Sequence, residues 1–218
     1  SATSAGASVT VRTAPEITTQ PMDQILCEGE TINLMVVSSG TAPLSYQWWK
    51  DGAPISRATS AMLSIPGALA ADSGSYFVVV TNVCGTDTSA AAEVTVRVAP
   101  TITTQPLDQT LCLDDALVLT AAAAGTLPIS YQWAKDGADL PGETASTLTI
   151  TSVTVADAGV YTVTATNACG SATSNPATVV VREPPTTTSD PTNQSICPGE
   201  TATFPVPAPG PPPPEYQS

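Results

Sequence analysis

The stretch "ADSGSYFVVVTNVCG" at residues 71–85 returns as "ADAGVYTVTATNACG" at residues 156–170. Each copy has a short acidic turn, then a run rich in Val and Thr around a Tyr, and then an Asn followed by Cys-Gly. A run rich in β-branched and aromatic residues, bounded by turn residues, predicts a β-strand. Because the whole phrase occurs twice, the chain is predicted to consist of copies of one β-rich unit.

The period of the repeat is 85 residues. Cysteines at positions 27, 112 and 197 are separated by this interval (112 − 27 and 197 − 112). The flanking phrases repeat as well, since "APEITTQPMDQ" matches "APTITTQPLDQ". The same interval separates Trp48 from Trp133, Tyr76 from Tyr161, and Cys84 from Cys169.

The repeat predicts the domain limits of the 218-residue chain. Two whole repeats are predicted as domains at 14–98 and 99–183. Residues 1–13 are expected to be the last strand of a preceding, truncated repeat, and residues 184–218 the truncated start of a third. There Pro205, Pro207 and Pro209 replace strand-forming residues. Because proline donates no ladder hydrogen bond, this Pro-rich end is predicted to be disordered.

Composition excludes several classes of partner. The net charge is −13 with only six basic residues, so nucleic acid and anionic lipid are poor partners for this surface. No apolar run approaches the roughly 18 residues of a membrane-spanning helix, so no membrane insertion is expected in this segment. Five cysteines in an acidic, Lys-poor chain indicate an oxidising, extracellular setting.

Further short strands complete each repeat. "TINLMVV" places Ile32, Leu34 and Val36 on one face, and "LSYQWWKDG" is a strand closed by an Asp-Gly turn. "AMLSI" brings either Met62 or Leu63 near the core. Several short strands with turn signals between them and no helical period predict an all-β fold of tandem β-sandwiches.

The residues resemble a known family. "GETINLMVVSSGTAPLSYQWWKDG" followed by "ADSGSYFVVVTNVCG" is similar to an intermediate-set immunoglobulin domain. More narrowly, the chain resembles the tandem immunoglobulin-like repeats of large secreted or cell-surface bacterial proteins, which implies an end-to-end array. Trp48 and Trp133 match the buried Trp of strand C, while Tyr76 and Tyr161 match the tyrosine corner before strand F.

The resemblance also identifies core positions. Where antibody domains carry their inter-sheet disulfide, the first repeat has Val36 and Val78. The second repeat has Ala121 and Val163 at the same places. These apolar pairs are therefore expected to pack on the strand-C Trp, and the cysteines of this chain must serve elsewhere.

The cysteine pairing depends on where an immunoglobulin sandwich places the two cysteines of one repeat. They lie at opposite poles, roughly 30–40 Å apart, whereas a disulfide needs Cα atoms within about 7 Å. An interdomain bond between Cys27 and Cys169 is therefore predicted, and Cys84, Cys112 and Cys197 would be unpaired because their partner repeats are absent. Two alternatives stay open: bonds within each repeat (Cys27–Cys84 and Cys112–Cys169), and free thiols.

Catalytic chemistry is not expected. The chain has no His, which excludes Ser/His/Asp and Cys/His nucleophile systems and His-containing metal sites. Asp72 and Asp157 lie in the tyrosine-corner turns and are interpreted as structural. The adjacent acids Asp114 and Asp115 are interpreted as a solvated turn, with a cation site as the alternative. The chain is predicted to be no enzyme and to bind no cofactor.

The predicted function is structural. The segment is expected to be a stalk or spacer of an adhesin-like, extracellular or bacterial surface protein, stiffened by disulfides between repeats. Its partners would be neighbouring repeats of the same chain, with a cell-surface protein or glycan as a further candidate. The alternative is that the repeats themselves bind a glycan or protein. Trp49 is the best exposed aromatic for that role, although the second repeat has Ala134 there.

Overall fold

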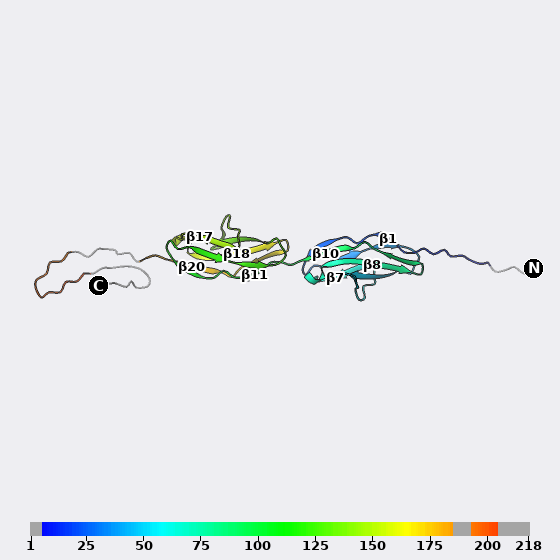
Figure 1. The fold of residues 1–218 in the computed structure, drawn as a ribbon, viewed down its shortest axis with the longest axis horizontal. Helices are drawn as coiled ribbons and strands as arrows, with labels where there is room; N and C mark the ends of the chain where they lie inside the picture. The colour runs from blue at the N-terminus through cyan, green and yellow to red at the C-terminus, as the bar shows by residue number, and fades with distance from the viewer. Residues whose placement is uncertain (1–5, 185–192, 205–218) are drawn as a thin grey trace, which may run out of the picture. The chain divides into compact units, whose positions relative to one another are not determined.

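The computed structural model describes residues 6–184 and 193–204. The chain divides into two compact units between Ala99 and Pro100, here called unit 1 and unit 2. Figure 1 shows that each unit is a separate group of strands with its own layers. Each unit is a β-sandwich, and the prediction of an all-β fold is confirmed.

One sheet of unit 1 has the strand order β2-β10-β8-β5-β6, with β9 also paired to β8. Strands β2 and β10 run parallel, and the other neighbours are antiparallel. The strands are β2 (Gln24–Cys27), β5 (Ser45–Lys50), β6 (Ala53–Pro54), β8 (Gly74–Asn82), β9 (Gly85–Thr88) and β10 (Ala92–Arg97).

The other layer of unit 1 consists of two antiparallel pairs whose strands alternate along the chain. β1 pairs with β4, and β3 pairs with β7. A short 3-10 helix leads into β8. The bounds are β1 (Glu16–Thr19), β3 (Ile32–Met35), β4 (Val37–Ser39), β7 (Met62–Ile65) and η1 (Ala70–Asp72).

Unit 2 repeats this topology with every element displaced by 85 residues. The strand order of its large sheet is β12-β20-β18-β15-β16, with β19 on β18. The elements are β11 (Thr101–Thr104), β12 (Gln109–Cys112), β13 (Leu117–Thr120), β14 (Ala122–Ala124), β15 (Ser130–Lys135), β16 (Ala138–Asp139), β17 (Thr147–Ile150), η2 (Val155–Asp157), β18 (Gly159–Asn167), β19 (Gly170–Thr173) and β20 (Ala177–Arg182).

Alternation of buried and exposed side chains explains why these stretches form strands. In β3, Ile32 and Leu34 are buried and Met35 is exposed, as a period of two requires. Strand β7 pairs with β3 in a register that places Leu63 opposite Leu34. Leu63 is 6% exposed and Met62 56% exposed. Leu63, and not Met62, is therefore the core residue of this strand.

Each unit has its own apolar core around a Trp. In unit 1, Trp48 is fully buried in one cluster with Val36 and Val78. In unit 2, Trp133 is fully buried in one cluster with Ala121 and Val163. The indole N–H of each Trp is satisfied by a carbonyl at 2.9 Å, Ser60 for Trp48 and Ala145 for Trp133. Burial of a large aromatic with its polar atom paired stabilises such a core.

The two end segments carry no regular element where they are described. Residues 6–13, expected as a final strand, form none; the backbone of this segment is held at Thr13, which accepts the N–H of Thr41 at 3.2 Å. Residues 193–204 form a hydrogen-bonded turn, with the Gln194 side-chain amide donating to the Thr203 carbonyl at 2.6 Å. Disorder is predicted for the whole of residues 184–218, of which 185–192 and 205–218 lie outside the described residues.

Candidate functional site

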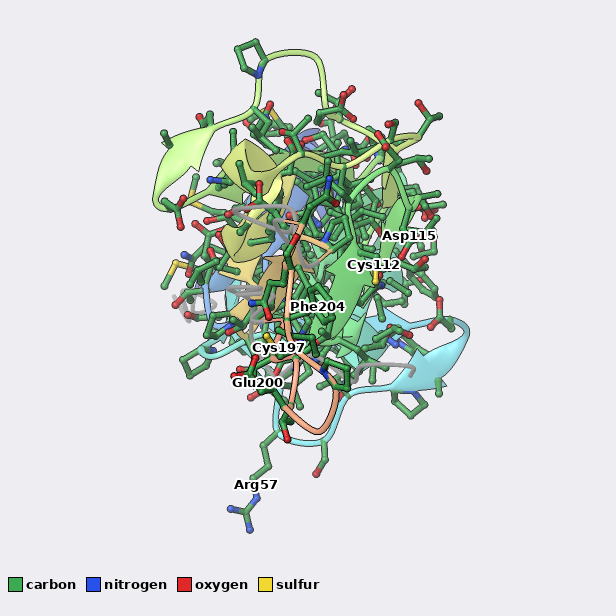
Figure 2. All side chains as sticks on the ribbon, turned by 90° about the vertical axis from the view of Figure 1, so that its left-hand side faces the viewer. Arg57, Cys112, Asp115, Cys197, Glu200 and Phe204 are labelled. Atoms are coloured by element: carbon green, nitrogen blue, oxygen red, sulfur yellow. The ribbon has the colours of Figure 1, made fainter. Side chains whose placement is uncertain are left out.

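The first class of cysteine lies in what we call the acid turns, residues 27–30, 112–115 and 197–200. In each, the backbone N–H of the Cys donates to the carboxylate three residues later. The distances are 2.7 Å for Cys27 and Glu30, 2.8 Å for Cys112 and Asp115, and 2.9 Å for Cys197 and Glu200. Figure 2 labels the second and third of these pairs.

The backbone closes every acid turn in the same way. The N–H of the acidic residue donates back to the carbonyl of the Cys at 3.2 Å in all three turns. The third position has a positive φ, taken by Gly29, Gly199 and, in the second turn, Asp114. The Asp114 carboxylate accepts a hydrogen bond from Ser152 at 2.9 Å. Both acids of the second turn are thus engaged in local hydrogen bonds.

The second class of cysteine lies in the asparagine turns, residues 82–85 and 167–170, which join β8 to β9 and β18 to β19. The Asn82 side-chain oxygen accepts the N–H of Cys84 at 2.8 Å. Asn167 accepts the N–H of Cys169 at the same distance. The Asn82 amide also donates to the Thr13 and Thr41 carbonyls at 2.8 and 2.9 Å. Each Asn therefore anchors its turn to neighbouring backbone.

The five cysteines, all within the described ranges, differ in oxidation state. Cys27 and Cys169 are disulfide-bonded. Cys84, Cys112 and Cys197 are free and exposed. Each class therefore contains a bonded cysteine and at least one free cysteine. Neither of the bonds considered within a repeat is formed, because each would require a cysteine that is a free thiol, Cys84 or Cys112.

Geometry within unit 1 explains why Cys27 and Cys84 are not bonded to each other. Cys27 is the register partner of Arg97 in β10, and β10 pairs with β8 around Gly74 at the beginning of β8. Cys84 follows the opposite end of β8. A nine-residue strand extends roughly 30 Å, whereas a disulfide needs Cα atoms within about 7 Å.

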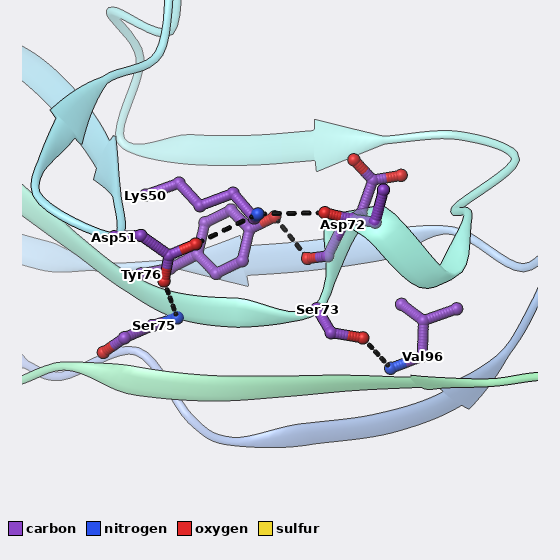
Figure 3. Close-up of polar contacts among 8 residues, drawn as sticks. Lys50, Asp51, Asp72, Ser73, Ser75, Tyr76 and Val96 are labelled. Atoms are coloured by element: carbon purple, nitrogen blue, oxygen red, sulfur yellow. Dashed lines mark hydrogen bonds and ion pairs between the residues drawn. The ribbon is translucent and has the colours of Figure 1, made fainter. Parts of the chain in front are cut away.

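The residues that could suggest acid–base chemistry form a tyrosine corner. The Tyr76 hydroxyl donates to the Asp72 carbonyl at 2.7 Å (Figure 3). The Tyr161 hydroxyl donates in the same way to the Asp157 carbonyl at 2.8 Å. Burial, reinforced by the nearby Asp carboxylates, raises the pKa of each Tyr to about 12. Both phenols are thereby kept protonated and able to donate.

The carboxylates beside the corner also serve local structure. The Asp157 carboxylate accepts the backbone N–H of Thr154 at 2.8 Å and its hydroxyl at 2.7 Å, and these bonds lower the pKa of Asp157. Lys50 lies 3.1 Å from Asp51 and donates to the Ala71 carbonyl at 3.0 Å (Figure 3). These acids therefore hold turns together.

Trp49, the exposed-aromatic candidate, stacks on Phe77 of the neighbouring strand. Their ring centroids are 5.9 Å apart with planes at 7°, and the two residues are register partners between β5 and β8. The Trp49 indole N–H is buried with no hydrogen-bond partner among the described residues. Unit 2 has Ala134 opposite Thr162. Phe77 was missed from the sequence, although strand register would have indicated it.

Neither a cluster of metal ligands nor a membrane-spanning helix occurs among the described residues. In the ranges 6–184 and 193–204, no three or more acidic, Cys or His side chains gather as metal ligands would. Within the same ranges, no helix has the length and apolar character needed to cross a membrane.

Comparison with protein families gives a match over most of the chain. Residues 14–82 and 99–167 each match the family model described as "Immunoglobulin domain". Roundabout homolog 1 of Rattus norvegicus is 34% identical over 168 residues, covering 72% of this chain and 10% of that protein. Endoglucanase C of Cellulomonas fimi is 32% identical over 193 residues, covering 82% of this chain and 17% of that protein. The chain thus spans less than a fifth of either relative.

Solved structures with the same architecture include an I-band fragment from titin. It has a TM-score of 0.69 and 25% sequence identity, covering 82% of this chain and 69% of that one. The N-terminal four Ig domains of Dscam1 give a TM-score of 0.59 at 23% identity, covering 80% of this chain and 47% of that one. At this sequence identity, the likeness to Dscam1 shows a shared fold and nothing further.

Proposed function

The chain belongs to the immunoglobulin domain family, and from that membership we propose that it is a stalk or spacer segment of a larger protein. The observation that carries the proposal is the oxidation state of the cysteines. Cys27 and Cys169 are disulfide-bonded, and disulfides persist in oxidising, extracellular settings. The parent would be a secreted or surface-anchored, adhesin-like protein.

In this proposal Cys27 of unit 1 is bonded to Cys169 of unit 2. The proposal is supported by the states of the cysteines, because the remaining three are free thiols and only these two are oxidised. Cys84, Cys112 and Cys197 would bond in the same way to further repeats of this kind. Neighbouring repeats of the same chain are then the main partners of each unit.

Such bonds would determine how a stalk carries load. Force would cross the bond from residue 27 to residue 169, follow the chain to residue 197, and cross the next bond there. This path contains 28 residues (197 − 169) for every two repeats, about 90–100 Å when extended. Two sandwiches placed end to end would span roughly 80–90 Å. The path would already be nearly taut, and unfolding would release almost no length.

Bonds within each repeat would behave differently. They would leave the same 28 residues for every single repeat, and each unfolding event would lengthen the array by about 5 nm. Single-molecule stretching of a long array of these repeats tests the difference. Without reductant we expect no unfolding steps, and with reductant a full series. Steps of about 5 nm per repeat in the oxidised array would contradict the stalk mechanism.

Peptide mapping without reductant tests the pairing itself. The expected product is a linked peptide pair containing Cys27 and Cys169. Recovery of a Cys27–Cys84 or Cys112–Cys169 pair would contradict the proposal. As a matched control, Cys27→Ser should convert Cys169 into a titratable thiol and leave the reactivity of Cys84 unchanged.

The matched relatives come from different kinds of organism. A bacterial parent is favoured in this proposal by the match to endoglucanase C of Cellulomonas fimi. A match to Roundabout homolog 1 supports an extracellular role as well.

Catalysis by residues 14–183 is not proposed, because the recurring acids accept hydrogen bonds within turns. Hydrolytic activity that disappears in Asp72→Asn or Asp157→Asn, with the fold intact, would overturn this part.

A second candidate function is ligand binding by unit 1. It is favoured by the stacked pair of Trp49 and Phe77, because aromatic faces bind sugar rings and protein side chains. A glycan panel tests it with the wild-type chain and Trp49→Ala. The corresponding positions in unit 2 are Ala134 and Thr162, so Ala134→Trp/Thr162→Phe is the matched gain-of-binding variant. Equal binding by all three chains would exclude this candidate.

A further inference from the structure

Strand β7 has one backbone edge without a neighbouring strand. Its partner on the other edge is β3, and just beyond this pair Val36 donates its N–H to the Ala61 carbonyl at 3.0 Å. Hydrogen-bonded and non-hydrogen-bonded pairs alternate along an antiparallel ladder. Leu63 therefore bonds to β3, while the N–H and C=O groups of Met62 and Ser64 point away from it. In the described part of the chain no further strand pairs with β7, and both outward residues are exposed.

The opposite edge of the same strand pair is capped by a side chain. The Gln24 amide donates to the Asn33 carbonyl of β3, and the Gln24 side-chain oxygen accepts the Asn33 N–H at 3.2 Å. In unit 2 the Gln109 amide donates to the Val118 carbonyl of β13 at 2.6 Å. An edge with unpaired N–H and C=O groups is a template for another strand. The β3 edge is thus protected, and the β7 edge remains available.

Apolar side chains lie beside the available edge. Met35 of β3 and Met62 of β7 are register partners, and they are 55% and 56% exposed. Val37, two residues after Met35, is 48% exposed. The equivalent register partners in unit 2 are Thr120 and Thr147. Exposed apolar side chains next to an unpaired edge favour association, and this combination distinguishes unit 1 from unit 2.

We propose that β7 of unit 1 pairs antiparallel with β7 of a second copy of this chain, which joins two copies laterally through a continuous sheet. The strand is complementary to itself, because Met62 would lie opposite Ser64 of the second copy and Leu63 opposite its own equivalent. A two-fold axis through this centre satisfies all the outward N–H and C=O groups of both residues in both copies. The inference is independent of how the cysteines are paired.

Charge favours a second copy over a charged peptide as the occupant. Residues 31–38 and 58–66, which contain β3 and β7, include no charged side chain. A basic or acidic strand would gain no ion pair at this edge, whereas two copies would meet there without facing like charges. Each chain carries a net charge of −13 elsewhere. Because salt screens this long-range repulsion, the dimer should become stronger as ionic strength rises.

The test uses a chain whose three exposed thiols are replaced, so that only non-covalent dimers form: Cys84→Ser, Cys112→Ser and Cys197→Ser. Sedimentation across a concentration series measures the Kd, and hydrogen exchange reports which amides the dimer protects. We expect the Met62 and Ser64 amides to exchange rapidly at low concentration and to become protected as the dimer forms. The Thr147 and Thr149 amides of unit 2 should keep the same exchange rates throughout.

Two kinds of variant separate the backbone edge from the apolar side chains. Ser64→Pro removes an outward N–H that makes no ladder bond within unit 1, so the unit should fold and the Kd should rise at least about tenfold. Thr149→Pro is the matched change in unit 2 and should leave the Kd unchanged. Met35→Thr/Met62→Thr gives unit 1 the residues with which unit 2 folds, and should also raise the Kd by about tenfold.

Several results would overturn the inference. One is a monomer at every concentration up to about 1 mM. Others are a dimer that Ser64→Pro leaves unchanged, and a dimer that Thr149→Pro weakens equally. Protection of the Met62 and Ser64 amides by an added extended peptide of unrelated sequence, without self-association, would assign the edge to a different partner and exclude the second copy.

Discussion

The Tyr76 hydroxyl donates a hydrogen bond of 2.7 Å to the carbonyl oxygen of Asp72, four residues earlier in the chain. The Tyr161 hydroxyl makes the same contact with the Asp157 carbonyl at 2.8 Å. Each bond ties the beginning of a central strand to the 3-10 helix before it. Both phenol rings are fully buried, so loss of the hydroxyl leaves a carbonyl without its donor.

Tyr76→Phe should therefore destabilise unit 1 while leaving the fold intact. The expected loss in the free energy of unfolding is about 1–2 kcal/mol, the range for removing one partner of a buried hydrogen bond. Hydrogen exchange of the β8 amides in the whole chain measures it, and the β18 amides of unit 2 serve as an internal control. Tyr161→Phe should produce the reverse pattern. Equal changes in both units would contradict the local role of the corner.

The core tryptophans should be far more sensitive to truncation than their exposed neighbour. Trp48→Ala and Trp133→Ala should each cost about 3–5 kcal/mol, because each removes a fully buried aromatic side chain. Trp49→Ala, which truncates a partly exposed residue, should cost about 1 kcal/mol or less. Denaturant unfolding of the three variants measures the difference. A loss below about 1 kcal/mol for Trp48→Ala would contradict its place in the core.

Gly74 lies between Asp72 and Tyr76 of the tyrosine corner, in a conformation that a side chain would strain. Its φ is +154°, and an added Cβ would lie 2.6 and 2.7 Å from the Asp51 carboxylate oxygens. Gly74→Ala should therefore cost roughly 1–3 kcal/mol. Gly67→Ala is the control, since Gly67 has φ +64° but open space around its Cβ position. Equal losses would show that the carboxylate contact has no effect.

Alkaline pH should weaken both units through their buried phenols. The pKa of Tyr76 and of Tyr161 is raised to about 12 from an ordinary value near 10. The folded state binds these protons more tightly than the unfolded state does. The resulting stability is fully present below about pH 10 and is lost as the pH rises through about 12. Urea unfolding across this range measures the slope, which the double variant Tyr76→Phe/Tyr161→Phe should reduce.

Much of the fold follows from the sequence because its signals are local. Strand periodicity, turn residues and the 85-residue spacing require no knowledge of distant contacts. They were sufficient to predict the sandwich architecture, which is confirmed. Local pattern could not choose between Met62 and Leu63, because both are apolar. The register of β7 against β3 makes that choice. Register also brings Phe77 against Trp49, a contact between strands that are distant in sequence.

The sequence by itself determined the repeat, the strands and the two classes of cysteine turn. It also favoured oxidation of Cys27 and Cys169, but it left bonds within each repeat and free thiols open, and only the tertiary structure decided among these alternatives. Cys27 and Cys112 occupy equivalent turns with the same carboxylate hydrogen bond, yet the first is disulfide-bonded and the second is free. Equivalent local sequences encode equivalent turns. A disulfide also requires a second sulfur within bonding distance, and that depends on chain segments far away in sequence.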